Sequence, residues 1–471
     1  APASAPTPAG APELASPAVK IDPALAEFRA GETLAVHGRL GHASLLARAP
    51  EETFLFIDIN AAADAKVART PVELALAIDQ SGSMRGDRQN NALAAARGMI
   101  GRLRDGDSVS VLTFSGRADV LVQPTVITPE SRARVLSQLT FAPSKGHTCL
   151  SCSIDTGLEL LRRRQGGIDR MLLLTDGEAN RGRTQTHELR ALASQARAAG
   201  VAISTLGVDA DYNEDALTAI SKESNGHHYF VERPSQLAPV FEAELGSLVA
   251  SVARGAVLTV DLAPGVEVLE IYDRSVQRAG ARLSAPLGTF SAGESKTLLV
   301  KLQLPPGELG PRDVADVALH YNDLTTGTSG QAHGALATTL VEDPRGVASL
   351  DAHVLGRITR SETVRALDEA SAMFDRGDDA AARTAIERQL GVVRDQRELH
   401  NKRAAAGELE PDAPDPVAGQ SEVLEQALSD LEARREREKA EEAASRRTGA
   451  PAVKKKRTLR KQVMDALDPF G

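Results

Sequence analysis

Tryptophan is absent from this chain of 471 residues, and aromatic residues make up only 3% of it. Proteins that bind single-stranded nucleic acid stack bases on aromatic side chains, so this composition disfavours such a role. A formal net charge of −9 also opposes binding of a phosphate backbone by the protein as a whole. No apolar run approaches the roughly 18 residues that a membrane span requires. We therefore expect neither a nucleic-acid partner nor a transmembrane segment.

Several catalytic motifs are absent too. The chain contains no G-x-S-x-G, no H-E-x-x-H and no G-x-x-x-x-G-K-[ST] sequence. Their absence disfavours the hydrolase and nucleotide-dependent chemistry that these motifs support. The many Asp and Glu residues outside the site described below have no partner that the sequence places beside them. We interpret the protein as a non-enzyme.

The composition that is present is typical of globular protein, with 42% hydrophobic and 25% charged residues. The length predicts about two or three folded units. The opening stretch "APASAPTPAGAPELASPA" begins with Ala and is rich in Pro and small residues, so it cannot pack a core. We interpret it as a tether at a mature N-terminus and expect an extracytoplasmic protein, secreted, periplasmic or at the cell surface. The alternative is a trimmed cytoplasmic protein.

Hydrophobic patterning divides the chain further. Strand-like segments both precede and follow a region in which apolar strands alternate with amphipathic helices, and helical patterns come last. The predicted division is a tether at 1–22, a β segment at 23–69 that pairs with a later β domain, an α/β domain at 70–252, a β-sandwich at 253–343, a helical hairpin at 344–405, a linker at 406–420, and a charged helix with little apolar face and a basic tail at 421–471.

The α/β region predicts a doubly wound, mostly parallel sheet, inserted in or flanked by the β-sandwich. Its strands "VELALAID" (Val72–Asp79) and "RMLLLTD" (Arg170–Asp176) are unbroken apolar runs. Strands have such continuous apolar sequences when helices cover both faces of the sheet. In open sheets of this kind ligands bind beyond the carboxyl ends of the strands. The residues that follow these two runs are therefore the candidates for a site.

Oxygen-bearing side chains stand at both of these strand ends. The first strand ends in "DQSGSM", which places Asp79, Ser81 and Ser83 at alternate positions on a tight loop, and the second ends at Asp176 in "LLTDGEAN". Carboxylates and hydroxyls are hard oxygen donors, which suit Mg²⁺, Mn²⁺ or Ca²⁺ rather than Zn²⁺. Ser and Asp are also ordinary turn residues, so an isolated D-x-S-x-S sequence also fits a capped turn.

These motifs together resemble a von Willebrand factor type A domain, and most closely its bacterial extracytoplasmic members. In that family the D-x-S-x-S loop, a Thr from a separate loop and the Asp of a T-D-G turn form a metal-ion-dependent adhesion site. The resemblance identifies the matching positions as Asp79, Ser81, Ser83, Thr148 and Asp176. It implies that the serines and Thr148 bind the ion directly, and that the aspartates act directly or through water.

The resemblance also implies a function. A hard ion such as Mg²⁺ keeps waters in its coordination shell, so one position can accept an acidic side chain of a protein partner. We therefore expect a metal-dependent protein-binding module for adhesion or assembly. An intracellular cofactor of an ATPase-driven assembly or metal-insertion complex is a second interpretation, because related domains have such roles.

Both cysteines of the chain lie in "GHTCLSCSID", directly after Thr148. In an exported protein Cys149 and Cys152 most simply form a disulfide that closes the loop carrying Thr148. Two free thiols, a redox-active pair at a helix N-terminus and a zinc site with His147 remain open alternatives. The redox pair makes a thiol-redox protein the third interpretation of function.

A basic segment, "KKKRTLRK" (454–461), lies near the C-terminal end. Leu459, Val463 and Leu467 recur at helical spacing, which predicts contact of this basic segment with an anionic surface or partner. A solvated tail is the alternative.

Overall fold

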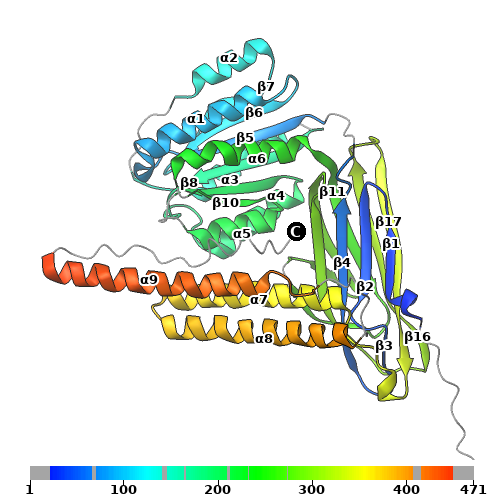
Figure 1. Cartoon of the computed structure of the whole chain (residues 1–471). Coiled ribbons are helices and arrows are strands. Elements are labelled where there is room, and N and C mark those ends of the chain that lie inside the picture. The colour runs from blue at the N-terminus through cyan, green and yellow to red at the C-terminus, as the bar shows by residue number, and fades with distance from the viewer. Residues whose placement is uncertain are drawn as a thin grey trace, which may run out of the picture.

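A computed structural model describes residues 22–65, 70–140, 146–163, 166–208, 213–231, 233–272, 274–406 and 415–448. Over these ranges the chain forms an α/β domain, a β-sandwich and a helical region (Figure 1). No helix in the described part of the chain is long and apolar enough to span a bilayer. The basic tail, residues 407–414 of the linker and all of the tether before Asp22 lie outside the described residues.

The α/β domain is built on a six-stranded sheet. Its strand order is β10 (His228–Val231), β9 (Ala202–Val208), β8 (Ile168–Thr175), β5 (Val72–Asp79), β6 (Ser108–Phe114) and β7 (Ala118–Val126). Only the pairing of β6 with β7 is antiparallel. Every residue of β5, β6 and β9 is buried, which explains why β5 is a nearly continuous apolar run.

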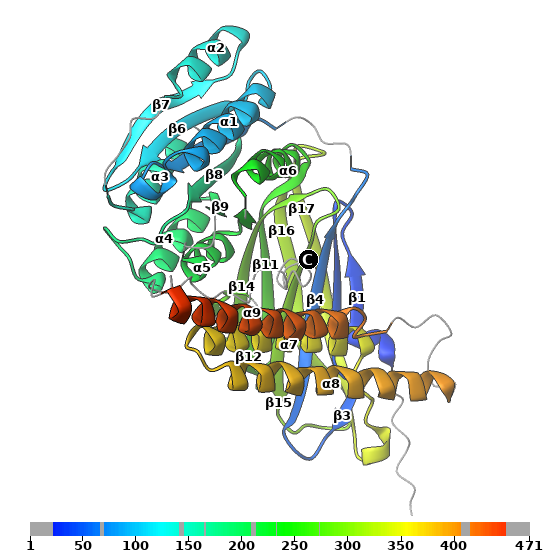
Figure 2. The same cartoon turned by 60° about the vertical axis from the view of Figure 1, so that its left-hand side comes forward.

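Helices cover both faces of this sheet (Figures 1 and 2). One face packs against α1 (Asp87–Arg102), α2 (Pro129–Gln138) and α6 (Leu237–Val249). The other packs against α3 (Leu150–Arg162), α4 (Thr186–Ala198) and α5 (Glu214–Ser224). The alanine-rich face of α1, with Ala92, Ala95 and Ala96 buried, lets this helix approach the strands closely. The predicted doubly wound, mostly parallel sheet is confirmed.

The β-sandwich consists of two sheets that enclose a single apolar core. Its first sheet has the order β1 (Glu27–Ala30), β2 (Leu34–Leu40), β4 (Glu51–Ala61), β15 (Ser295–Leu304) and β12 (Glu267–Tyr272). Its second has the order β13 (Gln277–Ala279), β14 (Arg282–Ser291), β11 (Ser251–Leu262), β16 (Gly310–Asp323), β17 (Ser329–Val341) and β3 (Ser44–Leu46). Strand β4 pairs with β15 and β3 with β17, so the α/β domain is inserted between two segments of one sandwich.

The sandwich contacts the α/β domain at the edge where the parallel strands begin. Helix α6 ends at Val249, and β11 starts two residues later. Arg254 of β11 donates to the carbonyl oxygen of Gly167, directly before β8, at 2.6 Å. The carboxyl ends of β5 and β8 therefore lie at the opposite edge of the sheet, away from the sandwich.

The helical region contains α7 (Ala352–Asp375), α8 (Asp379–Ala405) and α9 (Gln420–Thr448). Helices α7 and α8 are joined at Gly377, whose φ of 84° suits glycine. The sequence predicts little apolar face for the last helix, yet Leu424, Ala427 and Leu431 are buried against the other two helices. The first part of α9 therefore completes a three-helix core. In Figure 1 the far end of α9 projects beyond the ends of α7 and α8.

Candidate metal centre

Three loops meet at the carboxyl edge of the α/β sheet, which is the side formed by the carboxyl ends of its parallel strands. Asp79 is the last residue of β5, and Asp176 directly follows β8. These strands are parallel neighbours, with Ile78 opposite Leu174, so their ends lie side by side. Thr148 comes from the loop before α3. The fold thus brings the candidate residues from far-apart segments to one edge.

Asp79 is fully buried and both of its carboxylate oxygens accept hydrogen bonds. Its Oδ1 accepts from the backbone N–H of Ser81 at 2.7 Å, and its Oδ2 from the Thr175 hydroxyl at 2.6 Å. Burial raises the pKa of Asp79 from 3.8 to about 6, although the hydrogen bonds from Thr175 and Ser81 oppose the shift. A neighbouring cation would strongly favour the ionised form of such a buried carboxylate.

The two serines connect Asp79 to Asp176. Ser81 precedes the short helix η2 (Gly82–Met84), in which Ser83 lies, so the two hydroxyls come together at 2.9 Å. The Ser83 hydroxyl donates to Asp176 Oδ1 at 2.7 Å. Burial also raises the pKa of Asp176, and the Ser83 hydrogen bond and the Arg88 guanidinium oppose this shift. Ser81, Ser83 and Asp176 therefore form one connected row of oxygen atoms.

Thr148 lies next to this row of oxygen atoms, beside Gly177. A Cβ atom placed on Gly177 would lie 3.3 Å from the Thr148 hydroxyl and 3.8 Å from that of Ser83. Asn180 holds the Thr148 backbone on both sides, because its Oδ1 accepts from the Thr148 N–H at 2.9 Å and its own N–H donates to the Thr148 carbonyl at 3.1 Å. All five candidate residues therefore lie around a single small region.

Arg88 also belongs to this centre, although no sequence motif predicts it. It lies in the first turn of α1, and its Nη1 donates to Asp176 Oδ2 and to the Ser83 carbonyl, each at 2.9 Å. Asn180 and Thr175 are not predicted either. The sequence signal for Asn180 and Thr175 is their closeness to Asp176 in "LLTDGEAN", whereas nothing in the sequence pairs Arg88 with that aspartate.

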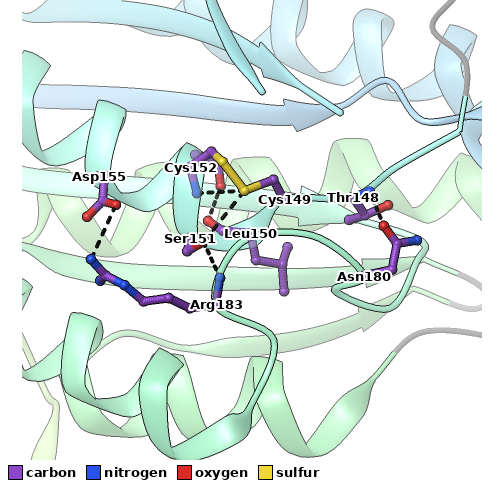
Figure 3. Close-up of a disulfide and its surroundings, with 9 residues drawn as sticks. Thr148, Cys149, Leu150, Ser151, Cys152, Asp155, Asn180 and Arg183 are labelled. Carbon is purple, nitrogen blue, oxygen red and sulfur yellow. Dashed lines mark hydrogen bonds and ion pairs between the residues drawn. A yellow bond between two sulfur atoms is a disulfide. The ribbon is translucent and has the colours of Figure 1, made fainter. Parts of the chain in front are cut away.

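Cys149 and Cys152 form a disulfide at the start of α3 (Figure 3). Cys149 is fully buried and is the N-cap residue of the helix, where its sulfur accepts from the Cys152 N–H at 3.3 Å. The Cys149 N–H donates to the carbonyl of Ser115, which follows β6, at 2.7 Å. The disulfide excludes the zinc site with His147 in this structure, and the burial of Cys149 favours a structural bridge over disulfide exchange.

The donor set suits a hard cation. Its five side chains offer only carboxylate and hydroxyl oxygens, which are the ligands of Mg²⁺, Mn²⁺ and Ca²⁺. Among the described residues no group of three or more His, Cys, Asp or Glu side chains could hold a metal ion. A cation site at this edge would therefore depend on the hydroxyls of Ser81, Ser83 and Thr148 as well as on the two carboxylates.

Comparison with known proteins agrees with this architecture. The family model of the von Willebrand factor type A domain matches residues 73–243. An uncharacterized protein of Synechocystis sp. is 26% identical over 345 residues, which are 71% of this chain and 81% of that protein. The uncharacterized protein YfbK of Escherichia coli is 27% identical over 277 residues. This match covers 55% of the chain and 47% of YfbK, so the chain spans about half the length of that relative.

Solved structures extend the similarity beyond the α/β domain. A von Willebrand factor type A protein from Catenulispora acidiphila is 17% identical with a TM-score of 0.66, covering 78% of this chain and 88% of that one. The ArnB paralog VWA2 from Sulfolobus acidocaldarius is also 17% identical, with a TM-score of 0.56 over 83% of this chain and 98% of its own. Residues 73–243 of this chain therefore form a von Willebrand factor type A domain, inserted in a β-sandwich and followed by a helical region.

Proposed function

We propose that the carboxyl edge of the sheet is a metal-ion-dependent adhesion site, which binds a divalent cation and through it an acidic residue of a protein partner. Von Willebrand factor type A domains are commonly metal-dependent protein-interaction modules. The observation that carries the proposal is the convergence of Ser81, Ser83 and Asp176 in one hydrogen-bonded row, with Thr148 across Gly177.

The spacing of this row supports the proposal. With bonds of 2.0 to 2.1 Å, adjacent ligands of an octahedral Mg²⁺ ion lie about 2.9 Å apart. The hydroxyl oxygens of Ser81 and Ser83 are 2.9 Å apart, and Ser83 Oγ lies 2.7 Å from Asp176 Oδ1. These atoms can therefore occupy neighbouring coordination positions after small movements. In this arrangement the 2.6 Å hydrogen bond from the Thr175 hydroxyl to Asp79 holds the start of the loop in position.

The charges around the site favour an acidic partner. A bound Mg²⁺ would supply an open coordination position for a carboxylate. Asp79 and Asp176 balance the charge of a divalent ion, and Arg88 adds a further positive charge next to Asp176. The loaded centre thus carries a net positive charge at the edge of the sheet that faces away from the sandwich. A partner Glu or Asp side chain is the ligand that this charge attracts.

An extracytoplasmic place of action belongs to the proposal. The Cys149–Cys152 disulfide next to Thr148 supports it, because disulfides persist in oxidising compartments and are rare in the cytosol of most organisms. We propose adhesion or assembly at the cell surface or in the envelope as the biological role, with Mg²⁺, Mn²⁺ or Ca²⁺ as the ion. A partner recovered from a cytoplasmic extract only would favour the intracellular assembly role instead.

The first test is metal binding by the full chain. Calorimetric titration with MgCl₂ and MnCl₂ should show saturable binding by the wild type and none by Asp79→Ala. Asp105→Ala is the matched control, because Asp105 is exposed and forms an ion pair with Arg132 near the start of β6, outside the proposed metal centre. Equal metal binding by the wild type and Asp79→Ala would contradict the proposed site.

The second test is partner binding. The tagged full chain should retain a protein from extracts of its native organism in Mg²⁺, and lose it in chelator. The Asp79→Ala variant should fail to retain the same protein even in Mg²⁺. Retention under all three conditions would show that recognition does not pass through the metal centre.

A further inference from the structure

Gly116 lies in the loop that joins β6 to β7, at the carboxyl edge of the sheet. Its φ does not lie in the left-handed region that favours glycine. The reason for a small residue here is space instead. A Cβ atom on Gly116 would lie 3.0 Å from Arg181 Nη1 and 3.6 Å from the Cβ of His147. The missing side chain therefore gives the Arg181 guanidinium room to lie on this loop, beside His147.

The loop that carries Arg181 is tied to the proposed metal centre. Arg181 directly follows Asn180, and His147 directly precedes Thr148. Figure 3 shows Asn180 and Thr148 facing each other. Asn180 Oδ1 accepts from the Thr148 N–H at 2.9 Å, and the Asn180 N–H donates to the Thr148 carbonyl at 3.1 Å. These two hydrogen bonds fix the position of Arg181 relative to Thr148, one of the proposed metal ligands.

The Arg181 side chain is available for contact with another molecule. It is exposed, and over the described ranges its guanidinium forms no hydrogen bond or ion pair. Arg183 of the same loop is different, because it forms an ion pair with Asp155 at 3.9 Å. In Figure 3 the Arg183 side chain points toward Asp155 and away from Thr148. One loop thus carries two arginines, of which Arg181 lies next to the metal centre with its charge uncompensated within the described ranges.

We propose that Arg181 is a second contact for the partner, and that the partner presents an acidic segment rather than a single acidic residue. One carboxylate of this segment binds the metal ion, and a neighbouring carboxylate binds the Arg181 guanidinium. Guanidinium groups suit this task because two of their N–H donors match the two oxygens of a carboxylate. The second contact presupposes the proposed metal-dependent function and specifies the ligand of that site.

Two contacts on one segment also explain how selectivity arises. Once the metal ion holds the first carboxylate, the second is confined close to Arg181, so its binding is effectively intramolecular. A segment with several acidic residues therefore binds more tightly than one acidic residue alone. Four extended residues cover about 10 Å, so a run of four aspartates offers carboxylates at several spacings from the metal ion.

The experiment compares two fluorescently labelled peptides with blocked ends, one of sequence Asp-Asp-Asp-Asp and one of sequence Gly-Asp-Gly-Gly. Each is titrated with the full chain in excess MgCl₂, and binding is followed by fluorescence anisotropy. The wild type should bind the four-aspartate peptide at least tenfold more tightly than the one-aspartate peptide. This ratio exceeds the roughly fourfold advantage that four equivalent carboxylates have by number alone.

Arg181→Gln should lose the preference for the four-aspartate peptide. The ratio of affinities should fall to about fourfold, while the Kd for Mg²⁺ and the affinity for the one-aspartate peptide stay at wild-type values. Arg183→Gln is the matched control, because it removes the same charge from the same loop, and it should keep the wild-type ratio. A wild-type ratio in Arg181→Gln, or an equal loss in Arg183→Gln, would overturn the proposed contact.

Gly116→Val tests the position of the guanidinium without changing the charge. The valine side chain extends beyond a Cβ that is already 3.0 Å from Arg181 Nη1, so Arg181 has to move away from this loop. The preference for the four-aspartate peptide should fall at least threefold, with an unchanged Kd for Mg²⁺. Full preference in this variant would show that long-range charge selects the peptide and that no placed contact exists.

Asp79→Ala and chelator separate the role of Arg181 from the metal-dependent function. Either treatment should abolish binding of both peptides. If the wild type shows no metal-dependent binding of either peptide, the proposed function itself is contradicted. If both peptides bind only with metal, but with the same ratio in the wild type and Arg181→Gln, the function stands and the role of Arg181 alone is refuted.

Discussion

Arg88 Nη1 lies 2.9 Å from Asp176 Oδ2, while the Ser83 hydroxyl occupies the other carboxylate oxygen at 2.7 Å. Both oxygens of the aspartate are thus engaged by side chains of the segment that follows β5. A cation that enters the proposed site competes with the guanidinium for this carboxylate. Arg88 therefore acts on the metal centre from a position that the family motif does not include.

Replacement of Arg88 by Gln should tighten metal binding. The variant removes a positive charge next to Asp176, and the gain should be on the order of 1 kcal/mol, a severalfold lower Kd for Mg²⁺ in calorimetric titration. Arg134→Gln, on α2, is the matched control and should leave the Kd unchanged. Weaker metal binding by Arg88→Gln would instead assign to Arg88 the role of holding Asp176 in place.

Asn180→Ala should weaken metal binding without unfolding the domain. Asn180 Oδ1 accepts from the Thr148 N–H at 2.9 Å, so its loss frees the loop that carries the Thr148 hydroxyl. A single hydrogen bond of this kind contributes about 1 kcal/mol to stability. We expect a severalfold higher Kd for Mg²⁺ together with a small decrease in the free energy of unfolding. An unchanged Kd would show that the backbone hydrogen bond to the Thr148 carbonyl is sufficient.

Removal of the disulfide should affect the same loop. The Cys149→Ser/Cys152→Ser variant keeps polar side chains but frees the residues directly after Thr148. We expect weaker Mg²⁺ binding in calorimetry and a modest loss of stability, since the bridge spans only three positions and closes a short loop. The wild type treated with reductant should behave like the variant. An affinity that is the same in all three samples would reject a role of the bridge in metal binding.

A pair of acids at the opposite edge of the sheet should make stability depend on pH. Glu73 and Asp169 lie opposite each other on β5 and β8. Burial, and then repulsion from Glu73, raise the pKa of Asp169 from 3.8 to about 7, although Arg254 opposes the shift. Between these two pKa values Asp169 is therefore protonated in the folded protein and ionised in the unfolded chain. The stability gained from that proton is complete below about pH 4 and is lost as the pH rises through 7.

Asp169→Asn should remove this dependence. Chemical unfolding at pH 5 and pH 8 should show that the variant gains about 1 to 2 kcal/mol relative to the wild type on going to the higher pH, a value discounted for the partial exposure of the side chain. Asp105→Asn, at an exposed acid of the same domain, should show no such gain. A constant difference between the variant and the wild type would mean that Asp169 is ionised throughout this pH range.

Leu424→Ala should destabilise the helical region by about 2 to 5 kcal/mol, because Leu424 is fully buried between α9 and the hairpin of α7 and α8. Leu399→Ala is the matched control, since Leu399 on α8 is 53% exposed. Metal binding should be the same in both variants, because this core is separate from that of the α/β domain. Equal stability of the two variants in chemical unfolding would mean that α9 does not pack on the hairpin in solution.

Much of the fold is predictable from hydrophobic patterning. The unbroken apolar runs of β5 and β8 indicate strands covered on both faces, and this pattern leads to the doubly wound sheet. The last helix is an exception to this pattern. Charged residues dominate α9, and its Leu and Val residues lie only in the first part. A pattern averaged over the whole helix therefore does not reveal the few positions that pack against α7 and α8.

The sequence alone determined the chemistry that the carboxyl edge of the sheet can offer. Asp79, Ser81, Ser83 and Asp176 follow apolar strands, and parallel strands place such residues at one edge whatever the remaining details. Tertiary structure decided which other groups act there. Arg88 meets Asp176 across 88 positions, and Asn180 meets Thr148 across 32, as a result of how α1 and the loop before α3 pack on the sheet. Contacts of this kind depend on three-dimensional packing, and local sequence periodicity carries no record of them.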